Sequence, residues 1–405
     1  MSEWVEKRLG DVCSLISRGI TPQYTDNGIY VINQKCVRDG KTDISLCRKT
    51  ANTTKIPNKK IVQYGDILIN STGAGTLGRT GIYKEKIDKI TVDTHVSIVR
   101  PNKDTSAFYL GYYLHSVEAI FDCFFHGSTN QTELYTKDIS NLKIILPSFL
   151  TQTRIAEILS AYDDTIENNN RRIDLLEKAA RELYHEWFVR FRFPGYKKAK
   201  FVNGLPKGWE VKKLGDVVNI TSSKRIYMSD YVDDGIPFYR SKEVIQSANG
   251  ETLTEPLFIS DERYNELKDK FGAPCENDIL ITSVGTIGIV FLVDNRIFYF
   301  KDGNLTWLQS GSNPELALYV YLCLTSNIGQ GALLSSTIGT SQSALTIENL
   351  KKIKLVVPND KVLGNFYNAS WELVKLERNL QSQSQNLARQ RDLLLPRLMS
   401  GKMEV

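Results

Sequence analysis

The sequence predicts a mixed α/β protein with a pseudo-two-fold internal repeat, in which two similar domains are separated by two long helices. Apolar residues at heptad spacing mark one long helix in the middle of the chain and another near its C-terminus, and the motifs of the first half return in the second. A chain of 405 residues is long enough for two domains that each have a core of their own.

Repeated motifs define the two domains, which we place at residues 1–150 and 207–360. Each domain opens with a tryptophan followed, after four residues, by Leu-Gly-Asp-Val. The matching segments are 4–12 and 209–217, 24–29 and 231–236, 66–69 and 278–281, 75–78 and 285–288, and 130–147 and 341–358, at shifts that lie between 205 and 212 residues. Small insertions account for this drift, so we interpret the pattern as a tandem duplication.

Short apolar runs bounded by Gly, Asn and Pro predict the strands of both domains, and helical spacing predicts their short helices. The predicted strands fall within 61–70, 95–101, 142–147, 277–283 and 353–358, and the predicted helices within 105–120 and 314–324. These strands are too short and too dispersed to predict a topology.

The first long helix is predicted over residues 151–190, with Thr151 or Thr153 as its N-cap and an end before Pro194. Its apolar positions alternate steps of four and three, the period that keeps one stripe of a helix facing a partner. This stripe consists of Ile155, Leu159, Tyr162, Ile166, Asn169, Ile173, Leu176, Ala180, Leu183 and Trp187. At 1.5 Å per residue the stripe is roughly 50 Å long.

A basic linker containing Pro and Gly at 191–206 leads to the second domain, which is followed by the second long helix and a tail at 361–405. Pro396 predicts the end of this helix. Its seam consists of Phe366, Leu373, Leu380, Leu387 and Leu394 at seven-residue intervals, with Ser370, Glu377, Ser384 and Arg391 at the alternate positions.

Both helices have polar outer faces, which favours exposed helices paired along one seam over burial in a single core. Because a whole domain lies between them in the chain, we predict that they pair with each other as an antiparallel coiled coil. In that pairing Asn169 would set the register or face a polar residue of the second helix.

One apparent cofactor motif, Gly73 to Gly78, has the spacing GxGxxG. A dinucleotide site requires a helix to begin there, so that its N-terminus faces the pyrophosphate. Residues 79–83 instead have the pattern of a turn and a strand, and Ser283 replaces the first glycine in the second copy. We therefore interpret this segment as a tight turn.

Other patterns of catalysis and metal binding are missing from the sequence. No GxxxxGK[ST] loop, GxSxG elbow, HExxH helix or Asn/Asp-Pro-Pro-aromatic segment occurs. The six cysteines form no CxxC pair and the four histidines have no ligand spacing, so we expect no metal site. The sequence also lacks a signal peptide and an apolar run of about 20 residues, so we expect a cytoplasmic protein.

The remaining functional candidates are polar and basic loop residues at matching positions of the two copies. Such side chains hydrogen-bond base edges and phosphates, and the net charge of +5 permits a nucleic-acid partner. Each residue alone would more simply be a solvated loop residue, so the hypothesis rests on the recurrence. The candidates are Arg18, Thr21, Gln34, Lys35, Ser71, Thr72, Arg79, Asn130 and Gln131 in the first domain, and Lys224, Arg225, Arg240, Lys242, Thr282, Ser283, Ser341 and Gln342 in the second.

Several segments, taken in order, resemble the specificity (HsdS) subunits of type I restriction–modification systems, and the resemblance covers essentially the whole chain. These segments are the tryptophan motif at 4–12 and 209–217, LYHEWFVRFRFPG at 183–195, LP(x)2W at 205–209 and RDLLLPRLMSG at 391–401. Each segment alone is weak, but their order is specific.

The resemblance implies two target-recognition domains that each read one half of a split double-stranded DNA site, held apart by the coiled coil. It implies a non-catalytic chain on which two modification (HsdM) subunits dock and methylate an adenine in each half-site, with S-adenosylmethionine bound to them and not to this chain. Restriction (HsdR) subunits would join to cleave DNA. The resemblance also implies a role for Gln131 and Gln342, near the DNA or near the helix junction.

Two other functions remain open from the sequence. The chain could be an enzyme in its own right, a methyltransferase or nuclease whose motif is not recognised, or a coiled-coil scaffold that joins protein partners without DNA specificity.

Overall fold

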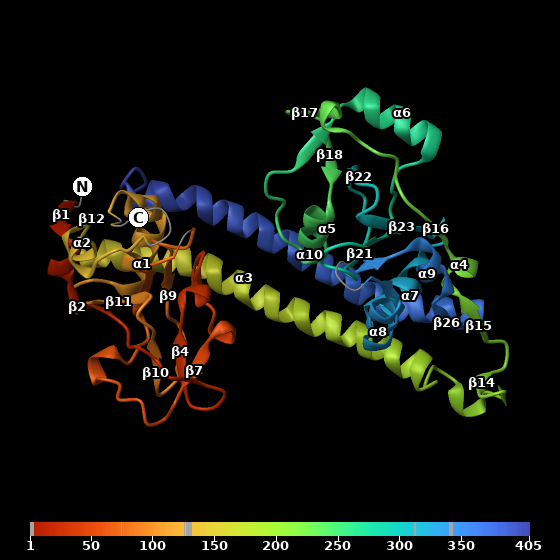
Figure 1. Ribbon diagram of the computed structural model, residues 1–405, viewed down its shortest axis with the longest axis horizontal. Coiled ribbons are helices and arrows are strands. Elements are labelled where there is room, and N and C mark those ends of the chain that lie inside the picture. Colours follow the sequence, from red (N-terminus) through yellow and green to blue (C-terminus); the bar gives the residue numbers. More distant parts are fainter. Residues whose placement is uncertain (1–3, 74, 125, 127–131, 312, 340–342) are drawn as a thin grey trace. The chain divides into compact units, whose positions relative to one another are not determined.

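The computed structural model describes residues 4–73, 75–124, 126, 132–311, 313–339 and 343–405 (Figure 1). The chain divides into two compact units, unit 1 formed by Met1–Thr165 with Leu387–Val405, and unit 2 formed by Ile166–Asn386. The long helices α3 (Phe149–Tyr184) and α10 (Asp360–Met399) each contribute residues to both units.

Unit 1 is built on a six-stranded sheet in the order β2-β11-β8-β9-β6-β5, with a four-stranded sheet in the order β10-β4-β7-β3 and a pair β1-β12. The strands are β1 (Val5–Arg8), β2 (Cys13–Arg18), β3 (Tyr24–Thr25), β4 (Ile29–Ile32), β5 (Val37–Arg38), β6 (Gly40–Thr42), β7 (Arg48–Thr50), β8 (Ile67–Asn70), β9 (Thr80–Ile82), β10 (Ile90–Val92), β11 (Val96–Pro101) and β12 (Lys143–Leu146). The helices of this unit besides the long ones are α1 (Ala107–Ser116) and α2 (Thr136–Asn141).

Strand β8 is buried on both faces, because successive side chains enter different cores. Ile67 and Ile69 pack in the core that contains α1 and the ends of the long helices, whereas Leu68 packs in the core shared with the four-stranded sheet. This explains the continuous apolar run that predicted a strand here.

Unit 2 repeats this plan with sheets in the orders β16-β23-β20-β21 and β17-β19-β18-β22, and with the pairs β15-β26, β13-β14 and β24-β25. The strands are β13 (Phe201–Val202), β14 (Leu205–Pro206), β15 (Glu210–Lys213), β16 (Asn219–Thr221), β17 (Tyr231–Val232), β18 (Ile236–Tyr239), β19 (Leu257–Ile259), β20 (Ile279–Thr282), β21 (Val290–Leu292), β22 (Tyr299–Phe300), β23 (Leu305–Gln309), β24 (Thr337–Ile338), β25 (Ala344–Leu345) and β26 (Lys354–Val357). The short helices are α4 (Leu214–Val217), α5 (Ser241–Ala248), α6 (Asp261–Phe271), α7 (Pro314–Thr325), α8 (Asn327–Ser335) and α9 (Ile347–Lys352).

Strand β20 of unit 2 has the same two-core arrangement as β8. Ile279 and Ile281 enter one core and Leu280 enters another. The two units therefore share the repeat that the motifs predicted, with the strand order β2-β11-β8-β9 matched by β16-β23-β20-β21, and unit 1 adds β6 and β5 to this sheet. The predicted strands at 61–70, 95–101, 142–147, 277–283 and 353–358 all contain strands of the structure.

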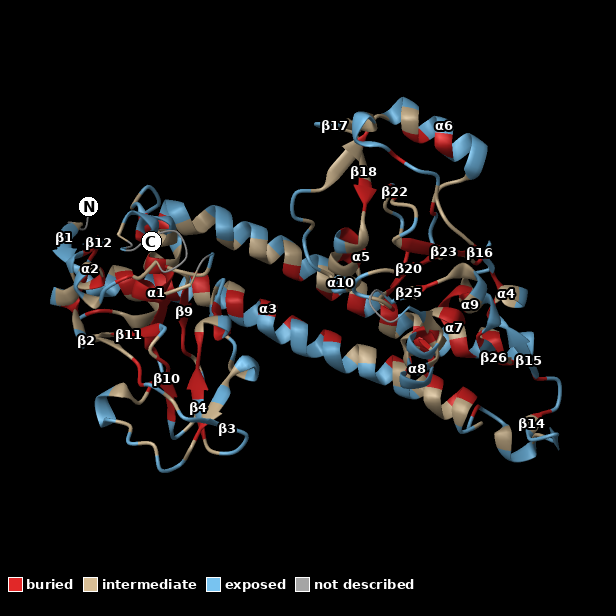
Figure 2. Cartoon of the chain, viewed as in Figure 1, coloured by how far each residue is buried: buried red, intermediate tan, exposed pale blue. Residues whose placement is uncertain are grey.

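The long helices run antiparallel in both units, and buried residues, in red, recur along both helices (Figure 2). In unit 1, Asp163 of α3 meets Arg391 of α10, and in unit 2 Asn169 meets Gln383, so that the residue number falls along α10 as it rises along α3. The predicted seam positions are buried or half-buried, and the alternate positions Ser370, Glu377 and Ser384 are buried as well. The predicted antiparallel coiled coil is confirmed.

The ends of the long helices differ from the prediction in two places. Helix α3 begins at Phe149, and the hydroxyl of Ser148 accepts a hydrogen bond from the backbone N–H of Thr151, so Ser148 is the cap instead of Thr151 or Thr153. Helix α10 continues through Pro396 to Met399. Pro396 is exposed in the last turn, where one missing hydrogen bond does not end the helix.

Residues 75–78 of the glycine-rich segment form the predicted turn. The backbone N–H of Leu77 donates to the carbonyl of Gly73 (3.0 Å), Gly78 has a φ of +80°, and β9 follows. No helix begins among the described residues 75–83, so this part of the chain lacks the helix that a dinucleotide site requires.

Within the described part of the chain, no single helix is long and apolar enough to cross a membrane. Helices α7 and α8 form a bent pair that is long and apolar enough, when the two are taken together, to be compared with a membrane span. Both helices supply core residues of unit 2.

Candidate nucleic-acid interface

Several of the predicted loops of unit 1 meet at one edge of its six-stranded sheet. Arg18, the last residue of β2, forms an ion pair with Glu133 and donates a hydrogen bond to the carbonyl of Leu134 (2.8 Å). Glu133 forms a backbone bridge with Thr72, whose hydroxyl bonds Nδ1 of His95 (2.7 Å). The structure thus brings together segments that are more than 100 residues apart in the chain.

The turn that follows β4 joins the same edge. Asn33 caps it by accepting a hydrogen bond from the backbone N–H of Lys35 (2.9 Å), and the Asn70 amide donates to the carbonyl of Gln34 (3.0 Å). Gly73 has a φ of +102°, which favours glycine, and a Cβ there would lie 2.7 Å from Oε1 of Gln34, so the end of the Gln34 side chain would have to move. Lys35 is exposed and Gln34 is half-buried.

Three predicted contact residues are buried and engaged inside the protein. The hydroxyls of Ser71 and Ser97 form a hydrogen bond (2.6 Å). At the matching place in unit 2, the hydroxyls of Ser283 and Thr306 form a hydrogen bond as well (2.7 Å). The Thr282 hydroxyl accepts a hydrogen bond from a backbone N–H (3.0 Å). These side chains hold the framework, and we leave Ser71, Thr282 and Ser283 out of the proposed contact surface.

The same serines anchor the next loop in each unit. The carbonyl of Ser71 accepts from the backbone N–H of Leu134 (2.9 Å), and that of Ser283 accepts from Leu345 (2.9 Å). Each leucine follows the predicted glutamine of its loop by three residues. Asn130, Gln131, Ser341 and Gln342 themselves lie outside the described residues.

Two of the predicted cations of unit 2 are exposed and partly engaged. Arg225 forms an ion pair with Asp302 (3.0 Å), and the Lys224 ammonium lies over the ring of Phe271 (4.7 Å). Both lie on the loop between β16 and β17 and retain free donors for an anionic partner.

The other two cations of unit 2 flank the start of α5. The Arg240 side chain donates two hydrogen bonds to Glu243, which is fully buried. Burial alone would raise the pKa of Glu243, but the hydrogen bonds from Arg240 outweigh it, so the pKa lies below its ordinary value. Arg240 therefore neutralises a buried charge, and its main role is structural. Lys242 is exposed and donates to the carbonyl of Thr254 (3.0 Å).

Three of the predicted residues have side chains that are free to contact a partner, namely Thr21, Lys35 and Arg79. Thr21 and Lys35 are exposed and Arg79 is half-buried, and none of the three makes a side-chain hydrogen bond or ion pair to another residue that the structure describes.

The sequence argument missed exposed aromatic side chains that lie beside basic ones. In unit 1 the Arg48 guanidinium lies 3.4 Å from the centre of the Tyr24 ring, and the Lys49 ammonium lies 5.2 Å from that of Tyr30. In unit 2, Tyr227 and Met228 are exposed on the loop that carries Lys224 and Arg225. The sequence does contain aromatic and basic residues on these short segments. Which of them lie side by side depends on strand pairing, which the sequence pattern does not give.

The described side chains suit hydrogen bonding and charge complementarity and not metal chemistry. No group of three or more His, Cys, Asp or Glu among these residues could hold a metal ion. Exposed donors on loops above a rigid sheet are typical of a surface that binds a polyanion.

Comparison with known protein families identifies the family of this chain. The family model of the type I restriction modification DNA specificity domain matches residues 1–178 and 206–363, so each match contains one of the two repeated domains. The chain belongs to this family. As a specificity subunit it is a non-catalytic component of a type I restriction–modification system.

This specificity subunit has relatives of similar length. It is 27% identical to the type I restriction enzyme MjaIX specificity subunit of Methanocaldococcus jannaschii, covering 100% of this chain and 94% of the relative. It is 22% identical to the HindI specificity subunit of Haemophilus influenzae, with all of both chains covered. The crystal structure of the S subunit from M. genitalium shares its fold, with a TM-score of 0.60 at 16% identity over 98% of this chain and 96% of that one.

Proposed function

We propose that each unit of this specificity subunit binds one half of a split double-stranded DNA site, and that the paired helices set the distance between the two halves. One observation carries the proposal: a single chain contains the same framework twice, and each copy ends in a long helix of the seam. A duplicated reading surface on a shared spacer fits a site that is itself in two parts.

The two copies share their internal bonds and differ in their exposed side chains, which supports different readouts. The buried hydroxyl pair of Ser71 and Ser97 in unit 1 has its counterpart in the pair of Ser283 and Thr306 in unit 2. The turn that follows β4 presents Gln34 and Lys35 in unit 1, whereas the matching positions in unit 2 are Ser241 and Lys242. Because the groups that would face the bases differ, the two half-sites are expected to differ in sequence.

The outer faces of the helices offer apolar contacts for partner proteins. Ile158, Leu175, Leu376 and Leu393 are exposed on α3 and α10. We propose that two modification subunits dock along these helices in the cytoplasm and carry the S-adenosylmethionine, and that restriction subunits complete the complex. The chain itself then supplies specificity and no chemistry.

A domain exchange tests whether each unit recognises its half-site independently of the other. Residues 207–355 are replaced by the matching segment of a relative, and methylated adenines are mapped across the genome of a cell that carries the chimaera and its modification subunit. We expect one half of the methylated site to change and the other to persist. A change in both halves would contradict the proposal.

Binding measurements separate this function from that of a protein scaffold without DNA specificity. The chain is mixed with its modification subunit and a duplex that contains the mapped site, and scrambled duplexes compete at several salt concentrations. Equal competition by scrambled DNA would favour the scaffold. Transfer of labelled methyl groups by the purified chain alone would contradict a non-catalytic role.

A further inference from the structure

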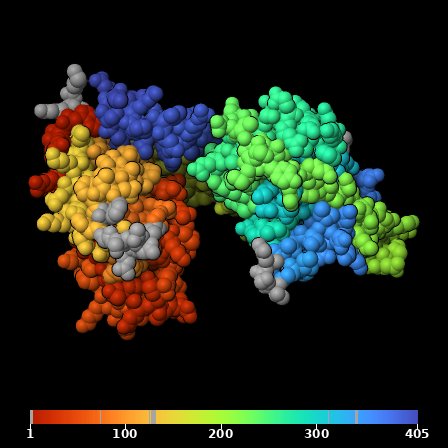
Figure 3. All heavy atoms as spheres, turned by 45° about the horizontal axis from the view of Figure 1, so that its top comes forward, coloured from red at the N-terminus to blue at the C-terminus, as the bar shows by residue number. Residues whose placement is uncertain are grey.

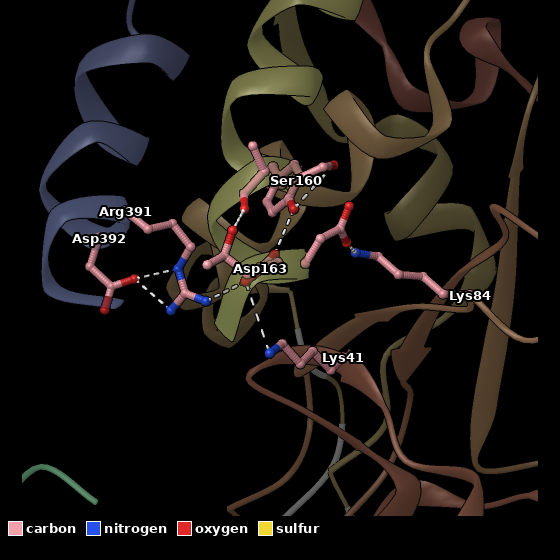
Figure 4. Close-up of polar contacts among 10 residues, drawn as sticks. Lys41, Lys84, Ser160, Asp163, Arg391 and Asp392 are labelled. Atoms are coloured by element: carbon pink, nitrogen blue, oxygen red, sulfur yellow. Dashed lines mark hydrogen bonds and ion pairs between the residues drawn. The ribbon is translucent and has the colours of Figure 1, made fainter. Parts of the chain in front are cut away.

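Asp163 is a buried carboxylate on α3 at which three other elements of unit 1 meet (Figure 4). Its Oδ1 accepts a hydrogen bond from Nη1 of Arg391 on α10 (2.6 Å) and lies 3.9 Å from the ammonium of Lys41 on β6. Its Oδ2 accepts from the hydroxyl of Tyr112 on α1 (2.6 Å). Only 7% of Asp163 is exposed, so these partners replace water around the carboxylate.

The charge of Asp163 is maintained by its partners. Burial favours the neutral acid, but the hydrogen bond from Tyr112 and the charges of Lys41 and Arg391 outweigh it, so the pKa of Asp163 lies below its ordinary value. An ionised carboxylate with donors on both oxygens has a fixed orientation, because hydrogen bonds to a charged group are short and strong.

The hairpin formed by β5 and β6 connects Asp163 with the candidate DNA-contacting turn. It begins directly after Gln34 and Lys35, and its base is closed by a hydrogen bond from the backbone N–H of Asp43 to the carbonyl of Cys36 (2.7 Å). Lys41 on this hairpin is half exposed, so its contact with Asp163 is the weaker of the three.

A second connection runs through α1. Gly40, with a φ of +72°, brings the hairpin against the ring of His115, and a Cβ at this position would lie 3.2 Å from that ring. His115 and Tyr112 are both on α1, and Tyr112 bonds Asp163. The hairpin therefore reaches the same carboxylate directly through Lys41 and indirectly through α1.

We propose that Asp163 is a positioning residue that joins the hairpin at 37–42 and α1 to the seam of α3 and α10, so that the turn bearing Gln34 and Lys35 keeps a fixed place on the spacer helices. An ion pair that only held the two helices together would need Arg391 alone. The additional bond to Tyr112 and the contact with Lys41 show that the carboxylate also holds the domain. The expected effect on DNA rests on the proposed function, whereas the mechanical connection does not.

Hydrogen exchange of the full chain with its modification subunit tests the mechanical part without DNA. Asp163→Asn keeps the shape of the side chain and removes its charge, and Tyr112→Phe removes only the bond to Oδ2. We expect amides of residues 34–43 to exchange about tenfold faster in both variants. Asp164→Asn is the matched control, because Asp164 is an exposed neighbour on the same helix whose ion pair, with Lys84, is long (3.9 Å). Unchanged exchange in both variants would overturn the proposal.

A charge reversal distinguishes positioning of the hairpin from simple pairing of the helices. Asp163→Arg combined with Arg391→Asp restores an ion pair across the seam but cannot accept a hydrogen bond from Tyr112 and repels Lys41. We expect this double variant to recover the thermal midpoint while residues 34–43 still exchange fast, and Lys41→Glu added to it to slow that exchange. Full recovery of the hairpin by the double variant alone would reduce Asp163 to a helix-pairing residue and overturn the proposal.

Methylation gives the functional readout. In the complex with Asp163→Asn, we expect the methylation rate to fall at least fivefold at the half-site assigned to unit 1 by domain exchange and to remain unchanged at the other. Equal loss at both half-sites would contradict positioning within unit 1. If the unaltered complex shows no sequence preference, the proposed function fails, and the exchange experiments alone decide the role of Asp163.

Discussion

Polar side chains are buried in the helix seam at positions where a coiled coil ordinarily has apolar ones. Asn169, Ser370, Glu377 and Ser384 are each less than 10% exposed. Asn169 donates to Oε1 of Gln383 (3.1 Å), and the Ser370 hydroxyl donates to a carbonyl of its own helix. Such residues lower the stability of a coiled coil but restrict its register.

Asn169→Leu is expected to stabilise unit 2 by about 1 kcal/mol, because a buried amide is exchanged for an apolar side chain and Gln383, which is exposed, remains hydrated. Denaturant unfolding measures the free energy. We also expect cysteine cross-links placed across the seam to form in more than one register, and a single register in the variant would show that other residues specify the pairing.

Glu377→Gln tests the pH dependence of the seam. Burial, followed by repulsion from Glu177, raises the pKa of Glu377 from 4.5 to about 7, against the charges of Arg378 and Arg181. The folded protein therefore binds this proton more tightly than the unfolded chain, and the associated stability is complete below pH 4.5 and is lost as the pH rises through about 7.

We expect unit 2 of the unaltered protein to lose on the order of 2 kcal/mol of stability between pH 5 and pH 8 through this group, and Glu377→Gln to lose much less. Urea unfolding at both pH values gives the comparison. Glu372→Gln, at an exposed position of the same helix, is the control. Parallel pH curves for Glu377→Gln and the unaltered protein would contradict the assignment.

At the scale of elements, unit 1 is completed by the far end of the chain. The space-filling view shows the C-terminal end of α10, in blue, against residues of unit 1 coloured red to yellow (Figure 3). Leu398 and Met399 are buried in the same core as Leu9, Val12 and Ile155. A Cβ on Gly401 would lie 2.8 Å from the ring of Trp4, so both ends of the sequence form one packed region.

Leu398→Ala is expected to destabilise unit 1 by about 2–4 kcal/mol, because it opens a cavity at a side chain that is 1% exposed. Hydrogen exchange should accelerate in residues 4–165 rather than only around the substitution. Leu393→Ala, at a position that is 60% exposed, should change stability by less than about 0.5 kcal/mol.

The periodic elements were predictable, whereas the loops were not. The seam from Ile155 to Trp187 follows from spacing alone, since one stripe of an isolated helix must face a partner. Ser71 and Ser283 were predicted as surface contacts because polar residues recur at these matching positions of the two copies, but strand pairing encloses their hydroxyls. The partners of Arg18 and Asp163 lie on other elements, and no periodicity reports those contacts.

At the scale of the whole molecule, the proposed function assigns spacing to the paired helices and DNA reading to the loops of the two units. Both helices pass from one unit to the other, so a change in their common length leaves the loops of each unit untouched. An insertion in α3 alone would put Asn169 and Gln383 out of register, because the helices are antiparallel.

Seven residues inserted at matching points of both helices should add roughly 10 Å to the spacer, which corresponds to about three base pairs of duplex. We expect methylation to require a gap between half-sites that is longer by this amount, with both half-site sequences retained. Methylome mapping measures both quantities. A change in the recognised bases would show that the helices also take part in reading.

The contribution of Leu387–Val405 to unit 1 has a consequence for synthesis. Roughly 220 residues separate Thr165 from Leu387, and a ribosome adding about 5–20 residues per second needs roughly 10–45 s to make them. During that time the nascent domain lacks Leu398 and Met399 in its core. The first half of this protein is translated early but reaches its final packing only after the end of α10 has been made, so a chain that stops before Leu387 would leave unit 1 incomplete even where unit 2 is whole.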